Sequence, residues 1–435
     1  MRVLFVNRKF VKFRVAGAAH ISLAANADHS EQSAALPNSS VRHTLNRDDV
    51  LQIGRPLYIF VPEQNIIRVV FPQVAELSTD RCWQAKCFLP SHDLECAFMP
   101  QLRQDRFTKE WVFVATESAE GPPAFAANRV HKSLAAFDPN CPICPGNEHR
   151  TAPEVLRVPA PGKCGWTVRV VPSQCDVASV DKGLVATNCA PHEAGGFVIR
   201  ETVVETPDHS LSTGNLPEAQ LARVWRASKG RFDELSLDSR IGHATIVKNH
   251  GVMSGASLEH SHSQVIATQI IPSHVSSWLQ QGQDHYRKCQ ECIFCRMVQD
   301  ELDAQTRIVT TTEHFVALEP FASPTPFCTH VYPRRHMANF GETNADEIND
   351  LARILHFTLG KIHFGLDDPD LTYRLRTAPA ANTGIQYYHW HLSIVPYLPP
   401  AFGIRKAGRV LMNSVSPERA AEYLKSVRLE EAIPA

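Results

Sequence analysis

The sequence predicts an α+β fold made of two tandem modules, each an antiparallel sheet with packed helices. Segments rich in β-branched residues and segments with apolar residues at helical spacing occur without the regular strand–helix alternation of a doubly wound parallel sheet. An ordered set of cysteines and histidines also occurs twice along the chain, which indicates a duplicated module. The 435 residues suffice for two or three domains of ordinary size.

The secondary-structure elements follow from local patterns. Three segments combine helical periodicity with start signals or clear length, and the helices are expected at 217–235, 347–364 and 418–429. Asn215 and Pro217 precede the first of these helices and are typical of a helix start. Strands are expected at 58–61, 66–71, 111–116, 167–171, 196–205 and 243–247.

Composition and charge exclude several classes of protein. The chain is 43% hydrophobic and 20% charged, with a formal net charge of −1. Neither nucleic acid nor an anionic membrane is favoured as a partner by so small a charge. No apolar run approaches the roughly 18 residues of a membrane-spanning helix, and the scattered basic residues near the start do not form a convincing targeting signal. We expect a cytoplasmic protein.

The pattern of predicted strands and helices becomes clearer after Met99, and we divide the chain into three parts. Residues 1–98 form an N-terminal extension of unknown role, which we expect to be dispensable. Residues 99–280 form the N-terminal, catalytic module, and residues 281–435 form the C-terminal module.

The repeated set of metal-ligand types is the most informative feature. Each set contains C-x-x-C, then one histidine, then the first histidine of H-x-H, and the last two ligands are 51 and 53 residues apart. Two thiolates and two imidazoles complete a tetrahedral zinc site of the structural kind. We therefore predict two zinc ions per chain, held by Cys141, Cys144, His209 and His260 and by Cys292, Cys295, His336 and His389. The competing interpretation is a redox dithiol with incidental histidines.

The first H-x-H motif also offers a nucleophile. Alternate residues of an extended strand share a face, so His260, His262 and Gln264 point the same way. A neutral imidazole can attack phosphorus and form a phosphoramidate. The preceding loop carries Asn249, Gly255 and Ser257, whose small size lets backbone amides approach a phosphate. Spacing alone leaves open that His262 is a zinc ligand or a buried strand histidine.

The segment from Lys248 to Gln264 resembles the active-site motif of galactose-1-phosphate uridylyltransferases of the histidine triad superfamily. Arg103–Ala115 is similar to that family's R-x-D-x-x-T-x-E-W-V segment, and the stretch beginning at Cys141 is similar to its first zinc knuckle. The resemblance covers about residues 99–429 and implies two histidine-triad-like modules.

The resemblance implies a role for each matching residue. His262 matches the uridylylated histidine, whereas His260 matches a zinc ligand. The predicted substrate-binding residues are Arg103, Asn249, Gly255, Ser257, Gln264 and His391. Superfamily hydrolases carry a histidine where this chain has Gln264, and transferases carry glutamine.

The implied reaction is a ping-pong exchange of UMP between UDP-glucose and galactose 1-phosphate, as in the Leloir pathway of galactose metabolism. Its partners are nucleotide sugars and sugar phosphates, and a homodimer is compatible with the sequence. The two H-x-H motifs differ, because Ser393 replaces the glutamine and Tyr387 and Tyr388 replace the small-residue loop. We predict that His262 is the sole nucleophile and that His391 only contacts substrate.

Departures from the family pattern keep an alternative open. Ser261 stands where the familiar transferases have proline, and the H-S-H-S-Q form is closer to plant-type relatives that phosphorolyse ADP-glucose. The segment 403–408 lacks the carboxylate expected at the sugar end. The alternative is therefore a phosphorylase of ADP-glucose, of another nucleotide sugar or of a dinucleotide, which uses the same histidine. Two other classes remain, namely a zinc-braced nucleotide-binding protein without turnover and a dithiol oxidoreductase.

Overall fold

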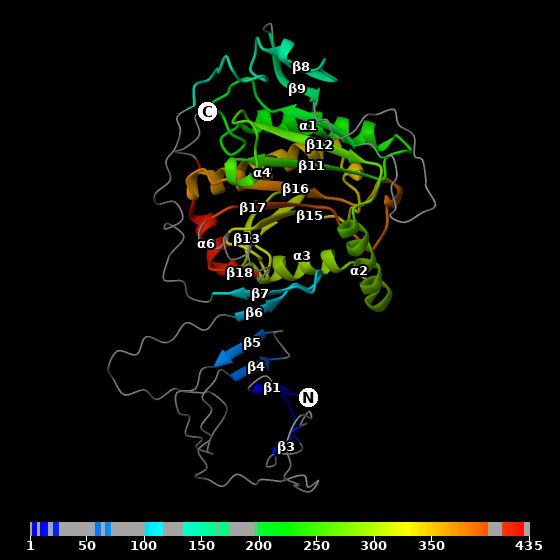
Figure 1. The fold of residues 1–435 in the computed structure, drawn as a ribbon, viewed down its shortest axis with the longest axis vertical. Helices are drawn as coiled ribbons and strands as arrows, with labels where there is room; N and C mark the ends of the chain where they lie inside the picture. Colours follow the sequence, from blue (N-terminus) through cyan, green and yellow to red (C-terminus); the bar gives the residue numbers. More distant parts are fainter. Residues whose placement is uncertain are drawn as a thin grey trace, which may run out of the picture.

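The computed structural model describes residues 101–115, 134–162, 165–173, 196, 198–398 and 411–429, together with the backbone of five strands nearer the N-terminus (Figure 1). Those five strands are β1 (Arg2–Val6), β2 (Lys9–Val15), β3 (Ile21–Ala25), β4 (Leu57–Val61) and β5 (Ile66–Val70).

A ten-stranded antiparallel sheet dominates the described part of the chain. Its strand order is β13-β14-β15-β17-β16-β11-β12-β10-β9-β8. The strands of the N-terminal half are β8 (Leu156–Pro159), β9 (Trp166–Pro172), β10 (Val198–Val204), β11 (His243–His250) and β12 (His262–Thr268). Those of the C-terminal half are β13 (Ile308–Thr311), β14 (Phe315–Leu318), β15 (Thr329–Pro333), β16 (Leu371–Arg376) and β17 (His391–Pro396).

The two halves of this sheet have the same topology. In each half the strands, numbered along the chain, lie in the order first, second, third, fifth, fourth, and the two fourth strands, β11 and β16, pair with each other. A long helix joins the third strand to the fourth, as α1 (Glu218–Ser236) in one half and α4 (Ala345–Gly365) in the other. The predicted α+β class and the two related modules are confirmed, and the two module sheets are fused into one.

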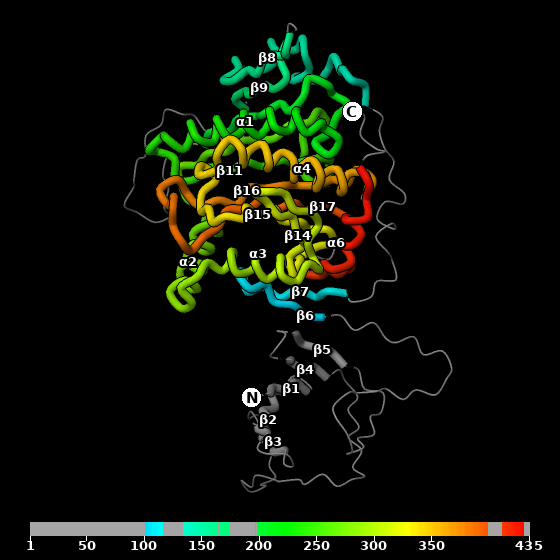
Figure 2. The backbone as a smooth tube through the Cα atoms, turned by 180° about the vertical axis from the view of Figure 1, so that it is seen from behind, coloured from blue at the N-terminus to red at the C-terminus, as the bar shows by residue number. Residues whose placement is uncertain are grey.

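Helices α1 and α4 cover one face of the sheet and leave the other to the histidine motifs. The two helices lie side by side over the strands (Figure 2) and bury residues at helical spacing, such as Trp225 and Leu355, in the main core. A capping box between Asn344 and Glu347 starts α4, so the helix begins two residues before the predicted start at Glu347. Val265 of β12 belongs to the same core, so His262 and Gln264 point to the opposite face.

Two helices that the sequence analysis did not predict connect the halves. They are α2 (Ser273–Cys289) and α3 (Ile293–Ala304), and the module boundary predicted at 280/281 falls inside α2. In α2 only Val275 and Gly282 are buried, which explains why no apolar periodicity announced it. Among the helices that the structure describes, none combines the length and apolar character needed to cross a bilayer.

A smaller sheet brings together strands that lie far apart in the sequence. Its order is β18-β7-β6-β5-β4, with β6 at Gln101–Gln104, β7 at Trp111–Val114 and β18 at Leu411–Asn413. Helix α6 (Pro417–Ser426) follows β18. The strands expected at 58–61 and 66–71 are β4 and β5, so the extension adds two strands to this sheet and none to the ten-stranded sheet.

We predict that a chain beginning at Met99 stays soluble and functional. All candidate site residues lie after this point, and β6 keeps its pairing with β7 when β5 is removed. Soluble yield, zinc content and nucleotidyl labelling should equal those of the full chain. A truncated chain that precipitates or takes no label would show that β4 and β5 are required to protect the exposed edge of β6.

Candidate active site

The first predicted ligand quartet is assembled in the N-terminal half. Cys141 and Cys144 lie in a tight turn in which the Asn147 side chain donates to the Cys141 carbonyl at 2.7 Å. His209 follows β10 and His260 precedes β12, so strands that are far apart in sequence bring the histidines to the turn. All four side chains are buried, and their ligand atoms lie within 4.8 Å of one another.

The spacing of these ligand atoms fits a tetrahedral zinc ion. Zinc about 2.3 Å from sulfur and about 2.0–2.1 Å from nitrogen gives edges of about 3.5 Å between nitrogen and sulfur and about 3.4 Å between nitrogens. Nδ1 of His260 lies 3.4 Å from Cys144 Sγ, 3.7 Å from Cys141 Sγ and 3.2 Å from His209 Nδ1. The donor set therefore matches the metal that the sequence predicts.

Hydrogen bonding and burial favour a cation in this cluster. The Nε2 atom of His260 lies 2.7 Å from the Thr206 carbonyl, so this nitrogen donates and Nδ1 is left as the ligand. Burial lowers the pKa of His260 to about 4, which keeps the ring neutral at neutral pH. Burial raises the pKa of the Cys144 thiol to about 11, so the thiol stays protonated at neutral pH unless a cation displaces its proton.

The second quartet is assembled in the same way in the C-terminal half. Cys292 is the N-cap residue of α3, and Cys295 lies in the first turn of that helix. Cys295 Sγ is 3.2 Å from His336 Nδ1 and 3.4 Å from His389 Nδ1, and all four ligand atoms lie within 4.8 Å. The His336 Nε2 atom is 2.9 Å from the Ile385 carbonyl and is thereby fixed as a donor.

His262 begins β12, two residues after the ligand His260, and is buried on the histidine face of the sheet. Its Nδ1 atom lies 2.8 Å from the carbonyl oxygen of His260, so Nδ1–H donates and the lone pair is on Nε2. Burial, assisted by the Lys248 ammonium, lowers the pKa of His262. The ring is therefore held neutral in the tautomer that a nitrogen nucleophile needs.

The predicted phosphate-binding residues lie in β11, in β12 and in the loop that connects these strands. Gln264 lies two residues after His262 on the same face of β12. Its Oε1 accepts from Arg200 Nη2 at 3.1 Å, which leaves the amide nitrogen to donate. Asn249 is the penultimate residue of β11 and accepts from the Thr372 hydroxyl at 3.0 Å. Ser257 and Gly255 are exposed in the connecting loop. Gly255 has φ +84°, a conformation that glycine adopts without strain.

This connecting loop is tied to the turn before β16. The Asp370 carboxylate accepts from the backbone N–H of Met253 at 2.6 Å, and a side chain at Gly251 would have its Cβ 2.3 Å from that carboxylate. Glycine at 251 is therefore required for the close approach. The C-terminal half thus fixes the loop that belongs to the N-terminal half's histidine motif.

His391 is at the equivalent place in the second half but in different surroundings. Its ring stacks on Tyr332 with centroids 4.8 Å apart and lies 5.7 Å from Phe294. Its Nδ1 is 3.5 Å from the His389 carbonyl, against 2.8 Å for the corresponding contact of His262. His391 is consequently packed among aromatic rings and lacks the loop and the amide that flank His262.

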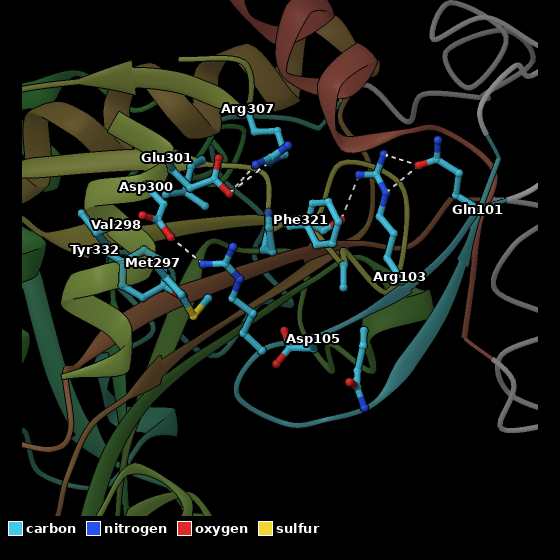
Figure 3. A pocket seen from close by; sticks show the side chains of 15 residues that line it. Gln101, Arg103, Asp105, Met297, Val298, Asp300, Glu301, Arg307, Phe321 and Tyr332 are labelled. Atoms are coloured by element: carbon cyan, nitrogen blue, oxygen red, sulfur yellow. Dashed lines mark hydrogen bonds and ion pairs between the residues drawn. The ribbon is translucent and has the colours of Figure 1, made fainter. Parts of the chain in front are cut away.

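Arg103 is not brought together with His262. It lines a cavity of about 500 Å³ between β6, α3 and the end of β14, which none of the residues at the start of β12 lines (Figure 3). Its guanidinium donates to Glu418, Gln101 and the Phe321 carbonyl. The other two arginines that line the cavity, Arg106 and Arg307, are also paired with carboxylates. The arginines of this cavity therefore link neighbouring elements of the fold. A contact of Arg103 with substrate stays a prediction.

Sequence reasoning missed Arg200, which holds Gln264. Arg200 and Thr202 alternate along β10, and Thr202 pairs with Gln264, so the three residues share the histidine face. The signal available in the sequence was the two-residue spacing of the polar residues Arg200 and Thr202 within the strand 198–204. The segment 403–408, where the sequence departs from the expected sugar-side pattern, lies outside the described residues.

Comparison with known proteins identifies relatives of the chain. No protein-family model matches the chain. It is 31% identical over 343 residues to ADP-glucose phosphorylase of Arabidopsis thaliana, covering 76% of this chain and 93% of the relative. It is 24% identical over 352 residues to galactose-1-phosphate uridylyltransferase of Thermotoga maritima, covering 76% of this chain and all of that protein.

Solved structures agree as well. A crystal structure of the Arabidopsis ADP-glucose phosphorylase with bound ADP-glucose superposes with a TM-score of 0.61 at 28% identity, over 76% of this chain and 99% of that one. A uridylyltransferase structure gives a TM-score of 0.57 at 25% identity, over 75% of this chain and 97% of that one.

The fold and the histidine motif thus define a nucleotidyltransferase-type enzyme. The chain belongs to the family that comprises the galactose-1-phosphate uridylyltransferases and ADP-glucose phosphorylase.

We predict that the zinc-loaded protein holds about two zinc ions per chain. Cys144→Ser removes a buried ligand and should remove about one equivalent of zinc and lower the melting temperature, because metal binding at such a site contributes folding free energy. Metal analysis and thermal unfolding measure both effects. The matched control is Cys289→Ser, an exposed cysteine at the end of α2 outside both clusters, which should keep both ions. Protein purified without chelator and free of zinc would contradict the prediction.

Proposed function

We propose that the chain is a nucleotidyltransferase that takes a nucleoside monophosphate from a nucleotide sugar onto His262, with phosphorolysis of ADP-glucose as its reaction. The observation that carries the proposal is the 2.8 Å contact between His262 Nδ1 and the His260 carbonyl, which leaves Nε2 as the nucleophile. A protein that only binds nucleotide, without turnover, would not need a histidine held in this tautomer beside a predicted zinc ligand.

The first half-reaction forms the covalent intermediate. Nε2 of His262 attacks the α-phosphorus, the bond from that phosphorus to the bridging oxygen breaks, and the sugar 1-phosphate leaves with the electron pair. The Nδ1–H bond to the His260 carbonyl stabilises the positive charge that develops on the ring. Because that carbonyl belongs to a ligand residue of the first cluster, the ring cannot turn as the charge develops.

The second half-reaction returns the nucleotide to an acceptor. A phosphate oxygen attacks the same phosphorus, the phosphorus–nitrogen bond breaks, and the nucleoside diphosphate leaves while His262 returns to its neutral form. A sugar 1-phosphate as acceptor gives a nucleotide sugar by the same step. The two clusters would each hold zinc, which braces the strands carrying the histidines when it is bound.

Three groups are proposed to hold the transferred phosphoryl group and its neighbour. Gln264, with its carbonyl oxygen held by Arg200, donates its amide to the α-phosphoryl oxygens. Asn249 and the exposed Ser257 offer polar side chains, and Gly255, at φ +84°, allows the turn between them.

The choice of ADP-glucose rests on similarity. The relative with 31% identity is named ADP-glucose phosphorylase, whereas the uridylyltransferases of similar coverage are 24–25% identical. The serine between the two histidines agrees with this choice. The order of the two candidate reactions is therefore the reverse of the order that the sequence motifs alone favoured.

The second candidate is the exchange of UMP between UDP-glucose and galactose 1-phosphate. It is supported by relatives named galactose-1-phosphate uridylyltransferase that match about three quarters of this chain. It uses the same intermediate on His262 and differs in base and acceptor. A cytoplasmic location and a homodimer stay predictions.

We predict that His262 is the sole site of covalent labelling. His262→Ala should abolish labelling by nucleotide sugar and lower turnover by several orders of magnitude, about the scale of other nucleophile deletions. The matched control His391→Ala removes the equivalent histidine of the second half and should still take label, with a higher KM or slower turnover. Retention of label by His262→Ala, with loss of label in His391→Ala, would reverse the assignment.

One experiment can identify both the nucleotide base and the acceptor. The enzyme is incubated with ADP-glucose or UDP-glucose, separated from free nucleotide, and chased with phosphate or galactose 1-phosphate. We expect label from ADP-glucose that phosphate releases as ADP. Label from UDP-glucose alone, released only by galactose 1-phosphate as UDP-galactose, would favour the second candidate.

A further inference from the structure

A buried polar cluster lies beneath the histidine motif, on the helix-covered side of the sheet. Its members are Glu205 after β10, Lys248 in β11 and Ser261 just before β12. The side chains of Glu205 and Lys248 are 0% and 1% exposed, and Ser261 is 3% exposed. Ser261 directly precedes β12, and the contacts of its hydroxyl with Lys248 and Glu205 show that its side chain points away from the face of His262.

The contacts of this cluster are complete. The Lys248 ammonium donates to Glu205 Oε2 at 2.8 Å, to Ser261 Oγ at 3.0 Å and to the carbonyl of His262 at 3.0 Å, which uses all three of its protons. The Ser261 hydroxyl donates to Glu205 Oε2 at 2.7 Å. Thr213 donates to the same oxygen, and the Tyr373 hydroxyl lies 3.3 Å from Oε1.

Electrostatics favour the ionised form of this cluster. Burial alone would raise the pKa of the Glu205 carboxyl, but Lys248 and the hydroxyl donors outweigh burial and hold it at about 2. A buried ion pair seldom adds net stability compared with apolar residues, whereas a fully hydrogen-bonded one fixes a single geometry. Here the geometry that it fixes is the backbone on both sides of the nucleophile.

We propose that Glu205, Lys248 and Ser261 form a positioning unit for His262. The unit rests on the proposed function and acts through backbone. It holds the His262 carbonyl and the Ser261 side chain from below, while Nδ1 of His262 is held by the His260 carbonyl from above. With residues 260–262 fixed on both faces, Nε2 keeps a constant position while phosphorus is attacked and released.

The test separates positioning from folding and from substrate binding. In zinc-loaded Ser261→Ala, the single-turnover rate constant for labelling of His262 at saturating nucleotide sugar should fall about 10- to 100-fold, the scale expected for a misplaced reacting group. Zinc content and the Kd for the nucleotide sugar should stay unchanged. Ser261→Thr keeps the hydroxyl and should restore most of the rate. The matched control is Ser228→Ala, a buried serine of α1 outside this cluster, which should label at the wild-type rate.

A second variant guards against an uninformative loss of folding. Glu205→Gln combined with Lys248→Met removes both charges together and leaves no uncompensated buried ion. This double variant should lower the labelling rate constant as much as Ser261→Ala does. The triple variant should lower it little further, because the three residues act as one unit. Strictly multiplicative losses would contradict the proposal.

A readout independent of turnover completes the test. In histidine-selective ¹⁵N NMR spectra, His262 of the wild type should be in the Nδ1–H tautomer, and Ser261→Ala should lower that fraction. Wild-type enzyme that never takes label would overturn the proposed function, and the tautomer measurement would still decide the positioning role. Unchanged labelling and an unchanged tautomer in Ser261→Ala would overturn the positioning role alone.

Discussion

The two-residue repeat of an extended strand is the constraint on which the account of this site depends. It places His262 and Gln264 on one face of β12, and the ligand residue His260 lies just before this strand, two residues from the proposed nucleophile. The His260 carbonyl then accepts the Nδ1 proton of His262 at 2.8 Å. The orientation of the reactive ring is therefore fixed by a residue of the buried ligand cluster. The intervening residue, Ser261, faces the other way and is available to anchor the segment from beneath.

Duplication explains how one fold supports two H-x-H motifs with different roles. Both halves use the same strand order, the same helix after the third strand and the same ligand types. The first half keeps an exposed loop and a glutamine beside its second histidine, whereas the second half packs His391 against Tyr332. The pairing of β11 with β16 fuses the halves, and Asp370 from the second half fixes the loop of the first. The second half therefore helps to hold the loop that precedes the first half's histidine motif.

Features with regular spacing could be predicted from the sequence, and features that depend on tertiary contact could not. Helices α1 and α4 were predicted because their buried residues recur at helical spacing, but α2 has only Val275 and Gly282 buried and shows no such pattern. The two ligand quartets were predicted because their order and spacing repeat. The Glu205–Lys248 pair spans 43 residues and is formed only when β10, β12 and β11 lie side by side, so no local pattern announces it. The fusion of the two sheets was missed for the same reason.

The measurement that tests the central claim most directly is peptide mapping of the wild-type enzyme quenched during turnover of ADP-glucose. The account predicts one nucleotidyl group per chain, joined through an acid-labile, base-stable phosphoramidate to the peptide that contains His262. Release of glucose 1-phosphate without any adduct would contradict covalent catalysis. An adduct on another residue would contradict the role assigned to His262.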